Sequence, residues 1–341
     1  MALRWTESFD WVDANQRYAN GDSGTTSGRY GGLAWYHPGE GVSYITLPPM
    51  DNQSTWIVGC AMRLSAPYTA DADAQYYTGA PNGYPIIGFL DNGTLQMHIQ
   101  TDHRGQLIAR QGAVIKGGGG MFLPNRWTYI EVKVFFSAVG FVEVRQDGVL
   151  VASAYGFNNG LSSHFYANQI QFANPSVQGV GYTLDDIYVC DGLGGSFNDY
   201  LGEIRYDTAR PIAPGAHTDF VSSTFGLNWQ NVDETTPDND TSYNSSGTVT
   251  AMDTFPIATL ATTATPLAVS LNSVATKDTF GGHQIKNVVR QGSTDYVPGV
   301  AHTIGSTYNC FSDLLTTQPD GAGGWTVAAL NAAQFGVKIS A

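Results

Sequence analysis

The sequence predicts an all-β fold, and three observations support this prediction. Forty glycines, with many Thr, Ser and Asn residues, disfavour long helices and favour strands joined by turns. Charged residues make up only 13% of the chain and hydrophobic residues 42%, so uncharged polar groups must cover most of the surface. Short apolar stretches, several of them alternating with polar residues, recur between turn signals. At 341 residues the chain is long enough for two domains.

Strand candidates follow one another through the first half of the chain. The Asn-Gly pair at Asn92 is a strong hairpin signal, and after it Leu95, Met97 and Ile99 are predicted to face inward, with Gln96, His98 and Gln100 outward. The clearest alternation places Ile130, Val132 and Val134 against Tyr129, Glu131 and Lys133, which predicts an antiparallel meander with one wet face. The candidates are Leu3–Val12, Leu33–Tyr36, Val42–Leu47, Thr55–Leu64, Ile86–Leu90, Thr94–Gln100, Leu107–Ile115, Arg126–Phe136, Phe141–Ala154, Gln169–Phe172 and the strand around Ile187.

The stretch from Tyr182 to Tyr206 divides the chain. Its first third is predicted to be a strand, which Asp191-Gly192 and the following glycines end. Leu201–Tyr206 is predicted to begin another strand. We therefore expect one β-sandwich over residues 1–195 and a second, smaller β-sandwich over residues 196–341, serving assembly or docking.

The second half is predicted to contain strands and one short helix. Trp325–Gln334 is rich in good helix formers. The predicted strands are Leu267–Ala275, Gln284–Val289, Ala301–Ile304 and Phe335–Ile339.

Several motifs resemble known families. Arg126-Trp-Thr-Tyr-Ile-Glu-Val-Lys-Val, Asp147-Gly-Val and Leu184-Asp-Asp-Ile-Tyr-Val together resemble the concanavalin A-like (laminin G-like) jelly-roll module. The later segments resemble minor structural proteins of tailed bacteriophages; they are Leu201-Gly-Glu-Ile-Arg-Tyr, Pro211-Ile-Ala-Pro-Gly, Asn228-Trp-Gln-Asn-Val-Asp-Glu, Asp238-Asn-Asp-Thr-Ser-Tyr and Trp325-Thr-Val-Ala-Ala-Leu-Asn-Ala-Ala-Gln-Phe-Gly-Val. This resemblance implies a virion protein, in the tail or tail tip, that carries a carbohydrate-binding type of fold.

The charge of the chain excludes some partners. Sixteen basic and 29 acidic residues give a formal charge of -13, which disfavours binding to nucleic acid and to anionic membranes. Cys60, Cys190 and Cys310 are far apart and match no zinc or disulfide pattern. The first ten residues contain no signal-like apolar run, and no window of about 18 apolar residues occurs. We expect synthesis in the cytoplasm of a bacterial host and residence in the virion.

Two groups of acidic residues have side chains of the kind that bind Ca²⁺. Asp10, Asp13, Asp185 and Asp186 could converge if the first and last strands of the sandwich pair, although each could instead cap a turn or face solvent. Asp238–Ser242 begins like an EF-hand, but Tyr243 replaces the required Gly and Val249 replaces the bidentate carboxylate. No cofactor is therefore predicted, and Ca²⁺ remains an alternative only at the first group.

Catalytic patterns are absent from the sequence. Glucanases with this fold use a Glu-x-Asp-x-x-Glu strand, whereas Glu131 is followed by Lys133 and Phe136. Neither His-Glu-x-x-His nor Gly-x-Ser-x-Gly occurs. The sequence analysis therefore predicts that the protein is not an enzyme.

Aromatic residues are the remaining functional candidates. Tyr68, Tyr76, Tyr77 and Tyr84 lie in an irregular segment with nearby Asp and Asn residues, and such a segment could stack against sugar rings. The same tyrosines could instead pack against the core or a neighbouring subunit.

Three functions remain open at this stage. The preferred one is a non-enzymatic structural protein of a phage virion, bound to other virion proteins and to copies of itself. The first alternative is a receptor-binding protein that contacts host surface glycan, and the second is a polysaccharide-cleaving enzyme.

Overall fold

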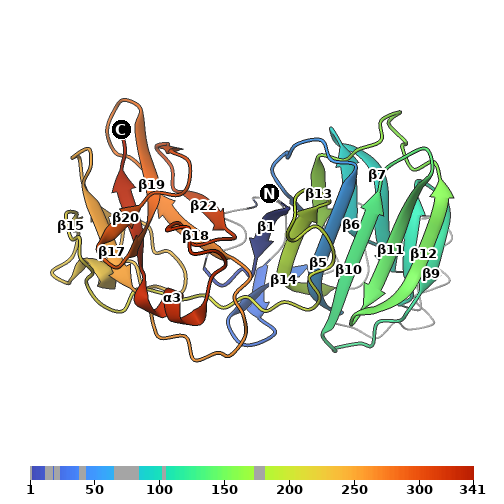
Figure 1. Ribbon diagram of the computed structural model, residues 1–341, viewed down its shortest axis with the longest axis horizontal. Coiled ribbons are helices and arrows are strands. Elements are labelled where there is room, and N and C mark those ends of the chain that lie inside the picture. The colour runs from blue at the N-terminus through green and yellow to red at the C-terminus, as the bar shows by residue number, and fades with distance from the viewer. Residues whose placement is uncertain are drawn as a thin grey trace. The chain divides into compact units, whose positions relative to one another are not determined.

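The computed structural model describes residues 2–11, 18, 24–37, 44–64, 84–101, 105–172 and 181–341. The chain divides into two compact units, Met1–Tyr206 and Asp207–Ala341, which Figure 1 shows with their strands labelled. The regular structure is almost entirely β, and the predicted fold class, a jelly-roll sandwich followed by a smaller β-sandwich, is confirmed. The division falls after Tyr206, and the predicted domain boundary falls after residue 195.

The first unit contains two antiparallel sheets, and we name the larger one the β5 sheet. Its strands, in spatial order, are β12 (Val149–Phe157), β11 (Gly140–Gln146), β10 (Thr128–Phe135), β5 (Thr55–Leu64), β14 (Tyr182–Asp191), β3 (Leu33–His37) and β2 (Gly24–Ser27), with β1 (Leu3–Glu7) also paired to β14. The first and last strands of this sandwich therefore pair, as the sequence analysis assumed.

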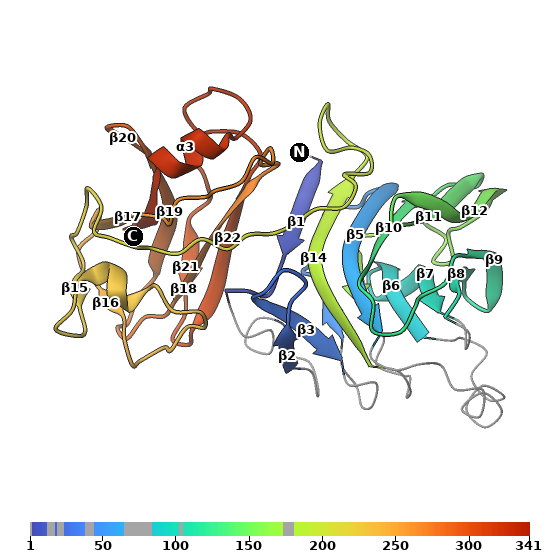
Figure 2. The ribbon, with the colours of Figure 1, turned by 90° about the horizontal axis from the view of Figure 1, so that it is seen from below.

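We name the second sheet the β7 sheet. Its strands, in spatial order, are β4 (Ile45–Thr46), β13 (Gln169–Phe172), β6 (Tyr84–Asp91), β7 (Thr94–Thr101), β8 (Leu107–Gln111) and β9 (Val114–Gly119). Figure 2 shows β14, β5 and β10 in one layer and β6, β7 and β8 in the other.

The inner faces of the two sheets enclose one hydrophobic core. The apolar residues that alternate along β10 are fully buried in it, as predicted; these are Ile130, Val132 and Val134. The prediction that Leu95 faces inward is wrong, because a β-bulge between the Phe89 and Leu90 pairings shifts the register at the start of β7. Leu95 is half-buried and lies outside the core cluster.

Glycines bring the edges of the two sheets together. A Cβ atom on Gly119 of β9 would lie 1.8 Å from the carbonyl oxygen of Val151 in β12, and one on Gly117 would lie 2.8 Å from that of Ser153. Only glycine permits such a close approach of two backbones. The glycine run that follows Lys116 therefore closes this side of the sandwich.

The second unit is a smaller β-sandwich. One sheet has the order β17 (Met252–Pro256), β23 (Gln334–Ile339), β19 (His283–Gln291) and β20 (Thr294–Tyr296), with β21 (His302–Ile304) also on β19. The remaining elements are the pairs β18 (Val269–Ala275) with β22 (Asn309–Leu315) and β15 (Val221–Ser222) with β16 (Asn244–Ser245), and the 3₁₀ helix η1 (Asn228–Asn231).

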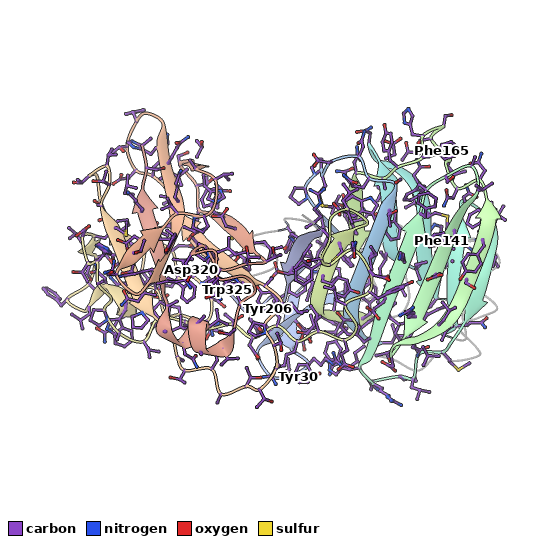
Figure 3. The ribbon with its side chains drawn as sticks, in the orientation of Figure 1. Tyr30, Phe141, Phe165, Tyr206, Asp320 and Trp325 are labelled. Atoms are coloured by element: carbon purple, nitrogen blue, oxygen red, sulfur yellow. The ribbon has the colours of Figure 1, made fainter. Side chains whose placement is uncertain are left out.

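The predicted helix of this unit is confirmed as α3 (Val327–Ala332). The side chain of Thr326 caps it by accepting a hydrogen bond from the backbone N–H of Ala329. Trp325, which Figure 3 labels, precedes the cap and is buried. It donates its indole N–H to the carbonyl oxygen of Leu315. It packs in a small core with Leu330. The sequence analysis missed β17 and β22, whose polar residues interrupt their alternation.

Leu201–Tyr206 is not a strand, contrary to prediction. Its backbone donors bind side chains of the β5 sheet instead of another strand. The N–H of Leu201 donates to the Tyr188 hydroxyl at 3.1 Å, and the N–H of Gly202 donates to Glu131 at 2.8 Å. This segment therefore lies against the outer face of the β5 sheet.

Candidate functional site

The tyrosines predicted to contact glycan are largely beyond what the structure describes. Tyr68, Tyr76 and Tyr77 lie outside the described residues. Tyr84 begins β6, where its backbone pairs with Thr101, but its side chain is also outside the description. Their assignment as glycan contacts remains a prediction.

Three of the four candidate Ca²⁺ ligands converge near the middle of β14. Asp185 accepts hydrogen bonds from the backbone N–H groups of Arg29, at 2.7 Å, and Asp186, at 2.8 Å. Asp10 accepts one from Leu33 at 2.6 Å and adds its charge to the group. Asp186 adopts a left-handed backbone conformation, with φ of 49°, where the pairing of β14 with β5 is irregular.

An arginine side chain contacts this acidic group. Nη1 of Arg29 lies 3.8 Å from Oδ2 of Asp186. Burial raises the pKa of Asp185 to about 8, and the charge of Asp186 adds to this rise. Burial likewise raises the pKa of Asp186 to about 6, although the Tyr206 N–H and Arg29 oppose it. Asp13 lies outside the described residues, and within the described ranges no group of His, Cys, Asp and Glu side chains is arranged to hold a metal ion.

A row of aromatic side chains crosses the outer face of the β5 sheet. Phe135 of β10 pairs with Phe141 of β11, and Phe141 pairs with Tyr155 of β12. The ring centroids are 5.8 Å apart in the first pair and 5.9 Å in the second. Phe135 and Phe141 are half-buried, and Tyr155 is 59% exposed. We name these three residues the aromatic strip, and Figure 3 labels Phe141 on β11.

Local sequence explains why these rings share one face. Residues of β10 and β11 alternate between core and exterior, and Val134 and Val142, next to the phenylalanines, face the core. The phenylalanines must therefore face outward. Cross-strand aromatic pairs also stabilise antiparallel sheets, so the strip is a natural product of this register.

A carboxylate flanks the aromatic strip and holds two tyrosines. Glu143 accepts hydrogen bonds from the hydroxyls of Tyr155, at 2.8 Å, and Tyr200, at 2.9 Å. The hydrogen bond to Glu143 raises the pKa of Tyr155, and burial together with the charge of Glu143 raises the pKa of Tyr200. Arg145 stacks on the Tyr200 ring, with its Cζ atom 3.8 Å from the centroid.

Further along the same face, the outer side chains are covered. Glu131 and Tyr188 are buried, and the Tyr188 hydroxyl donates to Glu131 at 2.5 Å. The segment Leu201–Tyr206, which follows β14 and which we name the connector, binds both residues through the N–H groups of Leu201 and Gly202. This part of the face is therefore closed to solvent. Among the described residues, the predicted wet face of the meander is therefore covered around Glu131 and open around the aromatic strip.

The outer face of the β7 sheet is polar but buried. Gln96, His98 and Gln100 are each at most 3% exposed. Gln96 accepts hydrogen bonds from the backbone N–H groups of Leu161 and Ser162 and so binds the loop before β13. His98 contacts Gln100 at 3.1 Å, and burial lowers its pKa to about 4, which keeps its ring neutral.

Comparisons with known proteins concern the fold. No family model matches the chain, and no curated protein matches it. Among solved structures, the endo-β-1,4-glucuronan lyase of the fungus Trichoderma reesei is 15% identical, with 55% of this chain and 90% of that chain covered and a TM-score of 0.37. A protein of unknown function with a galectin-like fold from Bacillus subtilis is 11% identical, covering 56% and 96%, with a TM-score of 0.36.

A further structure comes from a phage. A carbohydrate esterase from the Shiga toxin-encoding bacteriophage phi24B is 16% identical, with 50% of this chain and 87% of that chain covered and a TM-score of 0.34. At these identities the likeness concerns the fold alone. These proteins are jelly-roll or galectin-like β-sandwiches.

The comparisons correct one prediction. Polysaccharide lyases and a carbohydrate esterase are among the similar structures, which overturns the prediction that the protein is not an enzyme. The absence of a Glu-x-Asp-x-x-Glu strand excludes one catalytic arrangement, and it does not exclude others on this kind of sandwich. Separately, none of the helices in the described part of the chain is long and apolar enough to cross a membrane.

The sequence analysis did not identify the aromatic strip. Its signal was present, because Phe135 and Phe141 occupy outward positions of the two most clearly alternating strands. Only the pairing register shows that Tyr155 extends the same row. The hydrogen bond from Tyr200 to Glu143 depends on the path that the chain takes after β14, and no local sequence pattern predicts that path.

Proposed function

We propose that the protein binds glycan through the aromatic strip. A sugar ring presents C–H groups on its flat faces, and an exposed aromatic ring gives these groups an apolar surface to cover. The row of Phe135, Phe141 and Tyr155, with the polar groups of Glu143 and Tyr200 beside it, supplies both contacts. This row on an open sheet face is the observation that supports the proposal most directly.

The rigidity of the site also supports this function. The strip lies on three consecutive paired strands, and its exposed ring is fixed through the Tyr155 hydroxyl on Glu143. A surface ordered before binding loses little conformational entropy when a ligand arrives. Few rotamers remain to be restricted in Phe and Tyr side chains, which have only two side-chain torsions.

We propose further that the protein acts in a tailed-phage particle and contacts host surface glycan there. This part rests on the resemblance of the segments after residue 200 to minor structural proteins of such phages. Mass spectrometry of purified, washed particles tests it: the chain should remain with the particles, and its absence would contradict a place in the virion.

The binding proposal is tested with single substitutions in the strip. We expect Phe141→Ala to weaken binding to host polysaccharide roughly tenfold or more, because truncation of a central aromatic contact costs about 1.4 kcal/mol or more. Isothermal titration calorimetry measures the change. Val114→Ala, at an exposed apolar position of β9, is the matched control and should bind like wild type.

Equal affinity of Phe141→Ala and wild type would contradict the site. The same polysaccharide should also be assayed for released reducing ends, because the fold is shared with enzymes. Release by wild type would add an activity to the binding.

A further inference from the structure

We infer, building on the proposed function, that the aromatic strip binds a neutral glycan, laid across the strands, and rejects anionic polysaccharides. The charges around the strip indicate that the ligand is neutral. The order of the rings, from β10 to β11 to β12, indicates that the ligand lies across the strands.

The two cations near the strip are already engaged. Nζ of Lys133 lies 2.9 Å from Oδ1 of Asp199, and this lysine is also 5.7 Å from the centroid of the Tyr200 ring. Arg145 also stacks on the Tyr200 ring, with its Cζ atom 3.8 Å from the centroid. Neither cation extends freely toward solvent as an uronate or sulfate ligand would require.

The acidic group that contacts the strip directly is Glu143, which accepts a hydrogen bond from Tyr155. Around it, Lys133 and Arg145 contribute two positive charges and Asp199 one further negative charge, and Lys133 is already paired with Asp199. Glu143 contacts two neutral hydroxyls, so no ion pair with either tyrosine offsets its charge. An anionic polymer would bring a carboxylate close to Glu143, well inside the roughly 8 Å screening length of physiological salt.

The whole chain adds to this repulsion. Its formal charge of -13 disfavours the approach of any polyanion. A neutral chain meets no such barrier, and its hydroxyls can donate to the Glu143 carboxylate and to the oxygens of the tyrosine hydroxyls, whose own hydrogens bind Glu143.

The geometry gives the direction of the ligand. Phe135, Phe141 and Tyr155 follow one another from β10 to β11 to β12, perpendicular to the strands. Their centroid separations of 5.8 Å and 5.9 Å are comparable to the length of one sugar ring. Successive sugars of an extended chain can therefore cover successive aromatic rings.

Affinity gel electrophoresis tests this inference on the full chain. The neutral probes are xyloglucan, galactomannan and dextran, and the anionic probes are alginate and polygalacturonate, each at low and at high salt. We expect wild type to be retarded by at least one neutral probe, equally at both salt concentrations, and by neither anionic probe. Phe141→Ala should lose at least about tenfold of that affinity.

The variant Glu143→Gln examines the electrostatic argument directly. It retains an acceptor for a tyrosine hydroxyl and removes the negative charge, so alginate binding should increase relative to wild type. Lys133→Gln is the matched control, and it should not increase binding to alginate.

The two possible failures are distinguishable. Retardation by alginate or polygalacturonate that is lost at high salt and requires Phe141 would overturn the neutral-glycan inference and leave the binding proposal standing. Two results would overturn both the glycan-binding proposal and the neutral-glycan inference. In the first, wild type binds none of the probes; in the second, wild type and Phe141→Ala bind every probe equally strongly.

Discussion

The outer faces of the two sheets in the first unit differ in what they expose. The β5 sheet presents half-buried and exposed rings beside charged groups, around Phe141 and Tyr155. The β7 sheet presents amides and an imidazole, at Gln96, His98 and Gln100, yet these groups are buried. The comparison teaches that residue polarity does not identify the accessible face, because the segments that pack on a sheet decide it.

The burial of polar groups has an energetic consequence that separates the two faces. A buried amide, imidazole or carboxylate that loses a hydrogen-bond partner lowers the free energy of unfolding, because water cannot replace that partner. An exposed group can exchange the same bond for one with water. Substitutions on the β7 face and in the covered part of the β5 face should therefore change stability, whereas those in the aromatic strip should change binding.

The largest expected effect is a loss of stability in acid that depends on His98. Its folded-state pKa of about 4 lies below the ordinary value near 6.5, so between these values the unfolded chain takes up a proton that the folded chain does not. Stability due to this group is present above pH 6.5 and is lost as the pH falls toward 4, by up to about 3 kcal/mol. Urea denaturation at pH 7 and pH 4.5 should show a smaller acid loss in His98→Gln.

The comparison with His98→Gln is needed because other groups oppose this trend. Asp185 and Asp186 have raised pKa values in the folded chain, so their contribution to stability increases as the pH falls from about 8 toward 4. The difference between wild type and variant isolates the histidine. An identical acid loss in both proteins would mean that His98 is accessible to protons and that the two faces are alike.

The next effect concerns Gln96. Its truncation to Ala removes the acceptor for the N–H groups of Leu161 and Ser162 and the donor for the carbonyl oxygen of His164. We expect a loss of about 2 to 3 kcal/mol in the free energy of unfolding, measured by urea denaturation. Gln146→Ala is the matched control.

The control also removes a glutamine that binds backbone groups. Gln146 accepts from the N–H of Met121 and donates to its carbonyl oxygen, but these bonds are exposed and should contribute little. Losses of similar size at Gln96 and Gln146 would refute the distinction between buried and open amides.

The smallest effect compares two tyrosine–glutamate hydrogen bonds on the same face. Tyr188→Phe leaves the buried Glu131 carboxylate without one of its donors, and we expect a loss of about 1 to 2 kcal/mol. Tyr155→Phe breaks an exposed bond to Glu143 and should lose less than about 0.5 kcal/mol. Thermal and urea unfolding of both variants measure the pair.

A reversed order, with Tyr155→Phe the more destabilised variant, would show that the strip supports the fold more than the covered part does. The binding assay sharpens the same comparison. Tyr188→Phe should retain the affinity of wild type for a glycan ligand, since Tyr188 is buried away from the open surface.

Elements with local signals can be predicted from the sequence. Alternation in β10 and β11, the Asn92-Gly93 turn with its positive φ angles, and the Thr326-capped helix each depend on a few neighbouring residues. The acidic group at Asp185 could also be anticipated, because pairing of the first and last strands follows from the fold class.

The tertiary structure alone decided which surfaces are open. Because of a β-bulge, Leu95 lies outside the core. The connector, which was predicted to be a strand, instead forms hydrogen bonds to Glu131 and Tyr188. The aromatic strip arises because the pairing register of three consecutive strands places their outward rings side by side, and Tyr200 joins it from outside these strands through a hydrogen bond across 57 positions. Such contacts depend on packing between distant segments, which no local pattern encodes.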